Sequence, residues 1–455
     1  MIGLQRWPKV KQLREKLNGK AKAEPGFRFY VLYDKMYRKD FLEAAYAQCR
    51  SNGGAPGVDG QDFADIEAYG RERFLTELAD ELKELRYEPG PVRRVLIPKE
   101  GQPGKFRPLG IPNIRDRVVQ QAVKLLLEPI FEADFTAEAY GYRAGKSAHD
   151  AVLDVTASVR AGFTEVVDAD LSKYFDTIPH DQLMRSVERR IADRKVLWLI
   201  RHWLKVPVHG RNEQGRVVVS GGQKTKAGTP QGGVISPLLA NIYFRRFLVA
   251  WRQYGWHEKF RSRIVNYADD FVILSRGCGR QALDAARRLI QALGLTLNEE
   301  KTRLCKAGQD PFNFLGYTFE RLYSFGGRPY LGTRPADKSV KKFRETVREL
   351  TASDQVSKEA GTVAAAVNAV IRGYWNYYSW GTSSSLRWQL NQYVRERMKI
   401  WVLRKHTKPR KRKGMRRSRG KGLWAKVRAA EALLLDALKV PRHPAVRRNA
   451  ACLAQ

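Results

Sequence analysis

The stretch from Asn266 to Leu274, NYADDFVIL, places two adjacent carboxylates between apolar residues. A single buried strand through this stretch would bury at least one ionised carboxylate, which is very costly unless the charge is paired or bound to a metal. Two short strands joined at Ala268, Asp269 and Asp270 avoid that cost, because both acids then lie at the tip of a hairpin. The sequence therefore predicts a β-hairpin that projects Asp269 and Asp270 toward a solvent-reachable cleft. That geometry is typical of a metal site.

A second acidic segment can supply the further carboxylate that a metal site needs. It runs from Val166 to His180, VVDADLSKYFDTIPH, and its apolar start predicts a strand. Asp168 and Asp170 alternate along this strand and therefore share one face. Asp170 is nearer the carboxyl end and is the better candidate to meet the hairpin tip.

Three carboxylates from two adjacent strands suit a pair of Mg²⁺ ions about 3.5–4 Å apart. Mg²⁺ takes oxygen ligands and is often completed by the phosphates of a substrate. One ion would lower the pKa of an attacking hydroxyl, and the other would neutralise charge on a departing pyrophosphate. The pattern thus indicates phosphoryl-transfer chemistry.

The charge of the chain points to a polyanionic partner. Among 455 residues there are 83 Lys and Arg against 47 Asp and Glu, a formal net charge of +36. Basic side chains that contact phosphates release counterions, so nucleic acid is the expected partner. A hydrophobic content of 43% excludes a disordered basic tail and predicts two or three globular domains.

The spacing of the cysteines and the length of the apolar runs indicate in which cellular compartment the protein is expected. No two of the four cysteines have a CxxC spacing, which argues against a zinc ribbon or a disulfide framework. The segment from Met1 to Lys22 lacks an apolar signal core, and no run approaches the roughly 18 apolar residues of a membrane span. We expect a soluble protein of the bacterial cytosol or nucleoid, without a membrane partner.

Periodicity predicts an α+β unit up to about residue 335, then a helical unit and a basic tail. The first fifty residues read as helical. Further helices are expected at 71–85, 117–128 (ending before Pro129), from a Ser236 cap, at 281–293, and at 340–350, 363–378 and 386–403. Strands are expected at 92–98, 106–112, 166–171 and 295–298, with a basic turn between the first two.

A set of motifs in fixed order resembles the reverse transcriptase domain of group II intron-encoded proteins. They are VRRVLIPK (92–99), FRPLGIP (106–112), RDRVVQQAVKLLLEPIFEADF (115–135), YGYRAGKSAHDAV (140–152), VVDADLSKYFDTIPH, GTPQGGVISPLLANIYF (228–244), YADD, LTLNEEKT (295–302) and FLGYTF (314–319). IRGYWNYYSW (371–380) and WVLRKH (401–406) resemble the family's maturase-specific thumb, domain X.

The resemblance implies a right-hand polymerase of α+β class with an antiparallel palm sheet and a helical thumb. Residues 1–50 would form an N-terminal helical extension and 51–335 the fingers and palm. Residues 336–406 would form the thumb and maturase domain, and 407–455 a basic tail. The tail lacks the paired Cys and His of the HNH endonuclease that some members carry.

The resemblance also implies roles for single residues. Asp170, Asp269 and Asp270 would be catalytic and hold two Mg²⁺, with the Leu171 carbonyl as a further ligand. Phe175 would be the gate that excludes a ribose 2′-OH, and Lys301 a proton donor to pyrophosphate. The remaining dNTP contacts would be Lys99, Arg107 and Gln231, and the primer–template contacts Gly232, Gly233, Phe314, Leu315 and Gly316. RNA would be bound by Arg372, Trp375, Tyr377, Arg404, Lys405, Arg410, Lys411 and Arg412.

Several of these residues have simpler readings that the sequence leaves open. Phe175 and the aromatic residues of the helical unit could be core side chains, and the basic run at 403–422 could be a solvated tail. Gly145-Lys146-Ser147 resembles the end of a P-loop, but Tyr140 stands where that motif needs glycine. It is therefore not a nucleotide-hydrolysis loop.

The expected function is an RNA-directed DNA polymerase that also binds a group II intron RNA as its maturase. Its partners would be intron RNA, a DNA primer on an RNA template, dNTPs and target DNA. One alternative is a domesticated relative that serves DNA repair or phage defence. Another is a splicing cofactor that does not need its polymerase site, although three retained carboxylates argue against it.

Overall fold

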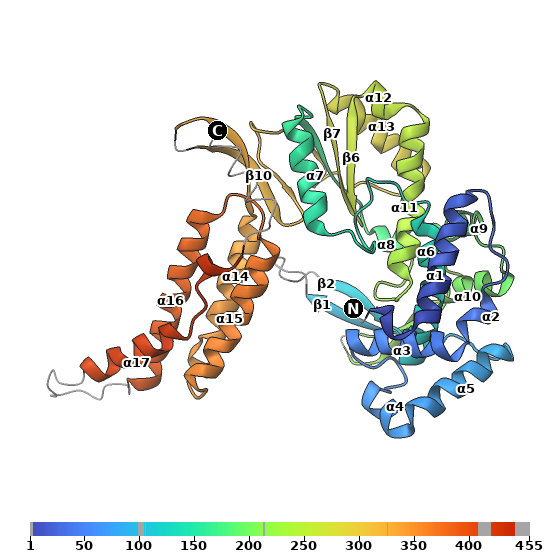
Figure 1. Ribbon diagram of the computed structural model, residues 1–455, viewed down its shortest axis with the longest axis horizontal. Helices are drawn as coiled ribbons and strands as arrows, with labels where there is room; N and C mark the ends of the chain where they lie inside the picture. Colours follow the sequence, from blue (N-terminus) through green and yellow to red (C-terminus); the bar gives the residue numbers. More distant parts are fainter. Residues whose placement is uncertain are drawn as a thin grey trace. The chain divides into compact units, whose positions relative to one another are not determined.

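The computed structural model describes residues 3–98, 104, 106–212, 214–324, 326–407 and 420–441. The chain divides into two compact units, Met1–Leu304 and Cys305–Gln455, which are described separately below (Figure 1). This division lies earlier than the boundary expected near residue 335. Strands that precede residue 335 therefore group with the helical unit.

The first unit begins with helices, as its sequence predicts. They are η1 (Leu4–Arg6), α1 (Pro8–Ala23), α2 (Tyr33–Met36), α3 (Lys39–Asn52), α4 (Phe63–Tyr69) and α5 (Arg71–Lys83). The apolar stripe of α3, including Phe41 and Leu42, is fully buried. Helices α1 and α3 pack against α6 (Ile114–Glu132), which forms the centre of this helical layer.

Helix α6 corrects the expectation that a helix ends before Pro129, because it continues through that residue to Glu132. A proline inside a helix leaves the carbonyl four residues earlier without its donor. Here that carbonyl, of Leu125, accepts a hydrogen bond from Arg14 Nη1 at 2.6 Å. Asn18 Nδ2 also donates to the Pro129 carbonyl at 2.8 Å. Side chains of α1 thus satisfy the backbone that the proline disrupts.

A four-stranded sheet carries the hairpin that the sequence predicts. Its strands are β1 (Val92–Pro98), β2 (Phe106–Ile111), β4 (Pro207–Arg211) and β5 (Val217–Gly221), in the order β2-β1-β4-β5. β1 and β2 pair antiparallel from Arg93–Ile111 to Pro98–Phe106, whereas β1 and β4 pair parallel.

A second sheet forms the centre of the first unit. Its strands are β3 (Glu165–Asp170), β6 (Ser262–Tyr267), β7 (Asp270–Ser275) and β8 (Arg303–Lys306), in the order β6-β7-β3-β8. The first two residues of β8 belong to this unit, which ends at Leu304. β7 is antiparallel to both β6 and β3. On one face, the ring of Phe271 lies 5.5 Å from Phe244 and 5.3 Å from Phe247 of α11 (Ser236–Gln253). Helix α11 therefore covers this apolar face.

The remaining helices of the first unit are α7 (Ala148–Arg160), α8 (Tyr174–Thr177), α9 (His180–Glu188), α10 (Arg194–Leu204), α12 (Trp256–Lys259) and α13 (Gly279–Ala292). Of these, α7, α12 and α13 contact the second sheet, and α9 packs against α10 and α11 (Figure 1). The helix expected at 281–293 is thus present, and Gly294 follows it with a positive φ of 68°.

Two local expectations in this unit are wrong. Ser236 does not cap α11, because the capping position is Ile235 and the Ser236 hydroxyl donates to the Pro230 carbonyl at 2.9 Å. Residues 295–298 do not form a regular strand, since only the isolated bridge between Leu297 and Leu171 is present there.

The second unit combines a small sheet with long helices. Its strands β9 (Phe312–Phe314), β10 (Tyr317–Tyr323) and β11 (Pro329–Pro335) are ordered β11-β10-β9. The helices are α14 (Asp337–Leu350), η2 (Ser353–Gln355), α15 (Ala360–Tyr377), α16 (Ser384–His406), α17 (Gly420–Ala432) and η4 (Ala437–Lys439). Their shared core includes Trp375 and Trp401, both fully buried.

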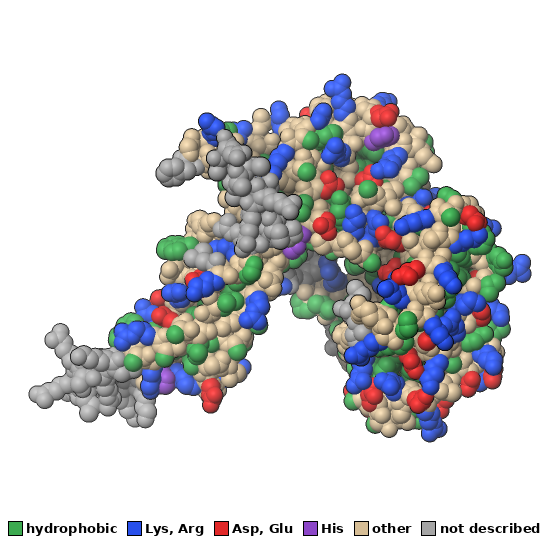
Figure 2. All heavy atoms as spheres, viewed as in Figure 1, with side chains coloured by type: hydrophobic (Ala, Val, Ile, Leu, Met, Phe, Trp, Pro, Cys, Tyr) green, Lys and Arg blue, Asp and Glu red, His purple; other side chains and the backbone are tan. Residues whose placement is uncertain are grey.

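Surface charge in the view of Figure 2 is distributed and not confined to one patch. Lys and Arg side chains are spread over both units and interspersed with Asp and Glu. Within the described residues, no helix combines the length and hydrophobicity that a bilayer crossing requires.

Candidate active site

The two adjacent acids lie at a hairpin turn, as the sequence predicts. Tyr267 and Asp270 are the last paired residues of β6 and β7, so Ala268 and Asp269 form a two-residue loop between them. Ala268 has a positive φ of 59°, a conformation that costs about 1 kcal/mol or more for a residue with a side chain. Neighbouring structure must therefore hold this turn.

The segment before α7 holds the turn in place. Asn266 exchanges backbone hydrogen bonds with it, donating to the Glu138 carbonyl and accepting from the Tyr140 N–H, both at 2.8 Å. The Asn266 side chain donates to the Ala268 carbonyl at 2.9 Å. A Cβ added at Gly141 would lie 2.4 Å from the Ala268 nitrogen, so only glycine permits this approach.

The register of the sheet brings the three expected catalytic carboxylates to one end. Asp170 of β3 lies directly opposite Asp270 of β7, and Asp269 immediately precedes Asp270 in the turn. Asp168 lies opposite Val272 and shares the face of Asp170. This face is opposite to the one that Phe271 presents to α11, so the acids lie away from that helix.

Electrostatics show how crowded these acids are. Burial, and then the negative charges of Asp269, Asp170 and Asp168, raise the pKa of Asp270 to about 7. Burial also raises the pKa of Asp269, and it raises that of Asp168 to about 6. Each carboxylate makes ionisation of its neighbours less favourable. A divalent cation would relieve this repulsion.

Basic side chains approach the acids from the segment after α13. Lys301 Nζ lies 2.6 Å from Asp170 Oδ2, and Arg303 Nε lies 3.4 Å from Asp168 Oδ2. Asn298 donates its backbone N–H to the Asp170 carbonyl at 2.8 Å and its side-chain amide to Oδ2 at 3.3 Å. Asn298 therefore fixes the short segment that carries Lys301 to the site.

The residues fit a metal in type and backbone position, but their side chains are not arranged as a closed metal cage. No group of three His, Cys, Asp or Glu side chains in the described ranges has metal-binding geometry. The Asp170 carboxylate instead faces Lys301. All-oxygen donors of this kind suit Mg²⁺. The Leu171 carbonyl, expected as a further metal ligand, takes part in neither of the backbone hydrogen bonds beside it. These run from Ser172 N to Thr296 O and from Asn298 N to Asp170 O.

Phe175 lies close to this end of β3, on α8. Its ring is partly buried against the main core, so the structure is compatible with a core role and with a role at the substrate. The Phe175 carbonyl accepts a hydrogen bond from Thr229 N at 2.6 Å, and Gln231 Nε2 donates to Asp176 Oδ2 at 3.3 Å. Gln231 is thereby held beside α8. The family resemblance implies that both Phe175 and Gln231 contact the dNTP.

Close backbone packing joins the Gln231 loop to β2. Gly110 N donates to the Gln231 carbonyl at 2.5 Å. Gly232 has a φ of 109°, and a Cβ added there would lie 2.2 Å from the Gly110 carbonyl oxygen. A Cβ at Gly233 would meet Ser236 Oγ at 2.7 Å. Gly232 is thus required by the contact between this loop and β2, whereas a side chain at Gly233 would displace the Ser236 hydroxyl.

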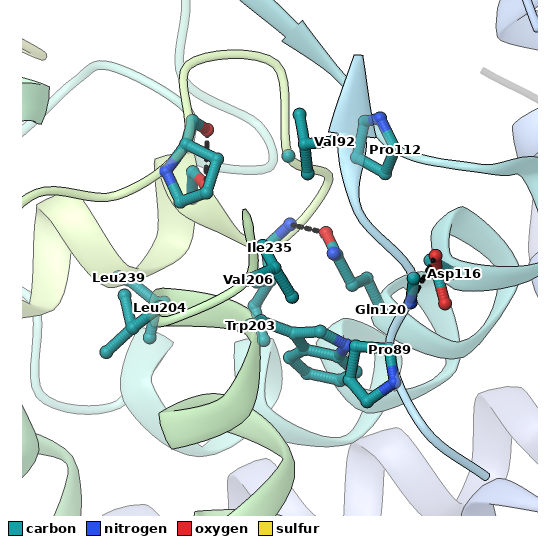
Figure 3. Close-up of a pocket in the computed structure, with 14 residues that line it drawn as sticks. Pro89, Val92, Pro112, Asp116, Gln120, Trp203, Leu204, Val206, Ile235 and Leu239 are labelled. Carbon is teal, nitrogen blue, oxygen red and sulfur yellow. Dashed lines mark hydrogen bonds between the residues drawn. The ribbon is translucent and has the colours of Figure 1, made fainter. Parts of the chain in front are cut away.

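Gln120 of α6 supports the segment between Gln231 and the start of α11 (Figure 3). Gln120 is buried, and its Oε1 accepts hydrogen bonds from Val234 N at 2.9 Å and Ile235 N at 3.4 Å. The side chain of a distant helix therefore satisfies donors at the start of α11. The cavity beside it, lined in part by Trp203 and Leu239, measures about 10 Å³. It has room for at most one water molecule and is not a substrate site.

Arg107, on β2, acts on the site through its charge. Its guanidinium opposes the burial that raises the pKa of Asp269, as does Lys301. It also opposes the rise in the pKa of Tyr142 that burial causes. Lys99, the other basic residue expected to contact a triphosphate, lies outside the described residues.

In the second unit, Phe314, Leu315 and Gly316 form a strained turn. Phe314 pairs with Tyr317, and the two residues between them have φ values of 49° and 76°. Tyr377 donates its hydroxyl to the Leu315 carbonyl at 2.9 Å, and Ala336 N donates to the Gly316 carbonyl at 2.8 Å. Strain that is held by several partners often marks a functional position.

Two family models match this chain. Reverse transcriptase (RNA-dependent DNA polymerase) matches residues 97–319, and the maturase-specific domain of group II introns matches residues 340–420. Protein YkfC of Escherichia coli is 33% identical over 393 residues, covering 77% of this chain and 98% of that protein. The chain belongs to the group II intron reverse transcriptase family.

Other relatives are longer than this reverse transcriptase. Group II intron-encoded protein LtrA of Lactococcus lactis is 37% identical over 216 residues, covering 47% of this chain and 34% of its own length. An uncharacterised 91 kDa protein in the cob intron of Schizosaccharomyces pombe is 26% identical, covering 81% of this chain and 54% of that protein. The chain thus spans about a third of LtrA and about half of the 91 kDa protein. A solved telomerase from Candida tropicalis, with TM-score 0.40 and 11% identity over 79% of this chain and 68% of that one, is too distant to support an argument.

The maturase-specific match makes the reverse transcriptase an RNA-binding chain, but its helical unit does not use every expected residue. Trp375 is fully buried with Arg387 over its ring at 4.5 Å, so it cannot stack on a base as expected. Lys405 donates to the carbonyls of Val356 at 2.8 Å and Lys358 at 2.6 Å. Its ammonium therefore stabilises a loop of its own unit.

The other expected RNA contacts of the reverse transcriptase have different positions. Arg372 and Arg404 are exposed, and Tyr377 is 37% exposed while it holds the Leu315 turn. Arg410, Lys411 and Arg412 lie outside the described residues.

Sequence reasoning missed three residues that organise the site of the reverse transcriptase. Asn266 holds the hairpin turn, Asn298 holds Asp170 and the Lys301 segment, and Gln120 supports the start of α11. Asn266 and Gln120 are polar residues in apolar surroundings, and that is a detectable signal. Asn298 stands three residues before Lys301 but carries no comparable mark.

Proposed function

We propose that this reverse transcriptase extends a DNA primer on an RNA template at Asp170, Asp269 and Asp270, with two Mg²⁺ as its cofactor. The observation that carries the proposal is the register of β3 and β7, which places Asp170 opposite Asp270 with Asp269 in the adjoining turn. Bound Mg²⁺ would lower the pKa of the primer hydroxyl and neutralise charge on pyrophosphate. The carboxylates, with the Leu171 carbonyl, would hold the ions.

The chain's other residues have positioning and proton-transfer roles in this proposal. Arg107 and Lys99 would bind the triphosphate, and Phe175 would lie against the sugar of the incoming dNTP. Lys301 is close to Asp170, so it would release that carboxylate to a cation and donate a proton to the departing pyrophosphate. Gln231, Gly232 and Gly233 would support the nascent base pair, and the turn at Leu315 would contact the primer.

We also propose that the protein acts as a maturase for a group II intron RNA, with target DNA as a further partner, in the bacterial cytosol. The maturase-specific match and the intron-encoded relatives support this role over a domesticated repair or defence enzyme. In the proposed division of labour, residues 51–335 are fingers and palm, residues 336–406 bind RNA with exposed side chains such as Arg372 and Arg404, and residues 1–50 and 407–455 flank them.

Metal removal and RNA capture test the two halves of the proposal. The purified chain should extend a primed RNA template with dNTPs, and EDTA should stop the reaction. Asp269→Ala should abolish extension while RNA affinity stays equal or rises, because a negative charge leaves a phosphate-binding cleft. Sequencing of copurified RNA should enrich one structured intron. Extension that persists in EDTA contradicts the metal assignment, and an unselective RNA population contradicts the maturase role.

A further inference from the structure

A hollow on the helical side of the first unit is lined by an unusual set of side chains. It lies between α9 and α11, measures about 230 Å³, and has an apolar floor that includes Phe131 and Ile242. Around that floor stand the guanidinium groups of Arg185, Arg189, Arg245 and Arg246. We call this feature the arginine pocket. The residues that line it belong to α6, to α9 and its end, and to α11, and α11 packs against both other helices.

The arginine pocket is separated from the catalytic acids by α11 itself. Phe244 and Phe247 of α11 face the sheet and contact Phe271. Arg245 and Arg246 lie between them in sequence, about 100° and 200° around the helix, and reach the opposite side. A ligand in the arginine pocket therefore cannot be the nucleotide or primer terminus at Asp170, Asp269 and Asp270.

Charge in the arginine pocket is far from balanced. Among the described residues, Asp134 supplies the nearby carboxylate: Arg189 pairs with it, and Nε of the neighbouring Arg190 lies 3.4 Å from it. Arg245 Nε donates to the Asp134 backbone carbonyl at 2.8 Å. The carboxylate thus pairs with two guanidinium groups, of which Arg189 alone lines the arginine pocket. Burial, and then the charge of Arg189, lower the pKa of Arg245. The like charges therefore repel one another, and a bound anion would relieve that repulsion.

Two of the arginines retain donors for such an anion. The Arg185 side chain is exposed and makes no hydrogen bond or ion pair with any other described residue. Arg246 donates Nη1 to Gln182 Oε1 at 2.8 Å, and Tyr243 donates to the same oxygen at 3.0 Å. Gln182 therefore orients Arg246 without neutralising it. Planar guanidinium forks in a concave site match the oxygens of a phosphate group.

From this geometry we propose that the arginine pocket binds a backbone phosphate of structured RNA, as a docking point on the face of the first unit remote from the active site. The inference rests on the RNA-binding role proposed above and adds a position to it. A hollow of this size admits one or two phosphate groups of a folded RNA backbone. It gives the chain a hold on RNA that does not compete with the template in the catalytic cleft.

The test compares charge removal inside and outside the arginine pocket in the full-length chain. The pocket variant is Arg185→Gln with Arg246→Gln, and Arg185→Gln alone is a milder second variant on an exposed side chain. The matched control is Arg280→Gln with Arg288→Gln, which removes the same charge from exposed positions on α13 of the same unit. Binding to a long structured intron RNA and to a short primed duplex is titrated against salt.

The pocket variant should bind the structured RNA about tenfold or more weakly, and its log–log salt slope should flatten by about 0.7–0.9 for each phosphate that is no longer neutralised. Extension of the short primed duplex should be unchanged, and the control should match wild type in both. Equal losses in pocket and control variants overturn the inference. The inference is also overturned if the pocket variant keeps its RNA affinity but, unlike wild type and the control, is no longer protected against heat by pyrophosphate. In that case the site holds a small phosphate. If wild type itself binds no structured RNA, the proposed function fails first.

Discussion

At the residue scale, the site depends on carboxylates whose charges oppose one another. Asp170 and Asp270 face each other across two strands, and burial raises the pKa of Asp270 to about 7. Lys301 balances part of this charge through its contact with Asp170. In the proposed mechanism the same lysine would donate a proton to the leaving pyrophosphate.

Replacing Lys301 should slow chemistry more than binding. Lys301→Ala should lower kcat for dNTP addition by about 10²-fold, the usual scale for losing a positioned acid, with a smaller change in KM. The pH–rate profile should lose its upper limb. Lys301→Arg keeps the charge but is a much weaker acid, so a rescue by arginine of the full rate would show that charge alone matters.

Phe175 should control the choice of sugar. Its ring is partly buried beside the end of β3. In the proposed role the ring fills the space that a 2′-OH would need. Phe175→Ala should raise incorporation of rNTPs relative to dNTPs by about tenfold or more, and Tyr174→Phe on the same short helix should leave the ratio unchanged. An unaltered ratio in Phe175→Ala would mean that the ring is only part of the core.

Asp116 gives a pH prediction away from the active site. Burial raises the pKa of this carboxyl to about 6, although Tyr87 donates to it at 2.6 Å. Between its ordinary pKa and about 6 the folded chain keeps a proton that the unfolded chain loses. The folded state therefore loses stability as pH rises from about 4 to about 6. Thermal unfolding of Asp116→Asn should lack this component, so the variant gains on wild type toward pH 7; a pH-independent difference would contradict the assignment.

At the scale of elements, the sequence predicted what short-range chemistry decides. Two acids inside an apolar run require a hairpin tip, and alternate acids require one face of β3; both features are present. Contacts with residues far away in the sequence decided the features that were not predicted. Helix α6 passes through Pro129 because Arg14, more than a hundred residues earlier, bonds the Leu125 carbonyl. Gln120 serves the start of α11 in place of Ser236.

The local sequence pattern likewise could not predict which residues of the helical unit are buried. Trp375 and Arg372 belong to one motif and one helix, yet Trp375 is core and Arg372 is exposed. The difference follows from the packing of α15 against α14 and from Arg387 of α16, which covers the Trp375 ring. An aromatic residue among arginines fits both a core and a base-stacking platform until that packing is known.

The loop that joins Gln231 to β2 should tolerate no side chain at Gly232. A Cβ there would meet the Gly110 carbonyl, which belongs to a strand and cannot move aside cheaply. Gly232→Ala should destabilise the fold by about 1–3 kcal/mol and lower primer extension. Gly215→Ala is the matched control, because Gly215 also has a positive φ but open space around it. Equal effects of the two variants would exclude the close approach as the cause.

At the scale of the whole molecule, RNA affinity should depend on charge beyond the catalytic unit. Eight Lys and Arg lie between residues 408 and 419. Replacing them with Gln keeps α17, which packs on α16, in the chain. We expect weaker binding to long structured RNA and a salt slope flatter by about 0.7–0.9 for each phosphate that these side chains had neutralised, with little change for a short primed duplex. An unchanged slope would make this run a solvated tail.

The central claim is that DNA synthesis on RNA takes place at the end of β3 and β7. Its most direct test is the rate of dNTP addition to a DNA primer on an RNA template, with Mg²⁺, by the full chain and two aspartate variants. Asp270→Asn should reduce the rate by about 10³-fold, since a metal's charge stabilisation is worth several kcal/mol. Asp168→Asn, on the same face but outside the proposed metal ligands, should stay within about tenfold of wild type. A wild-type rate in Asp270→Asn, or an equal loss in both variants, would contradict the account.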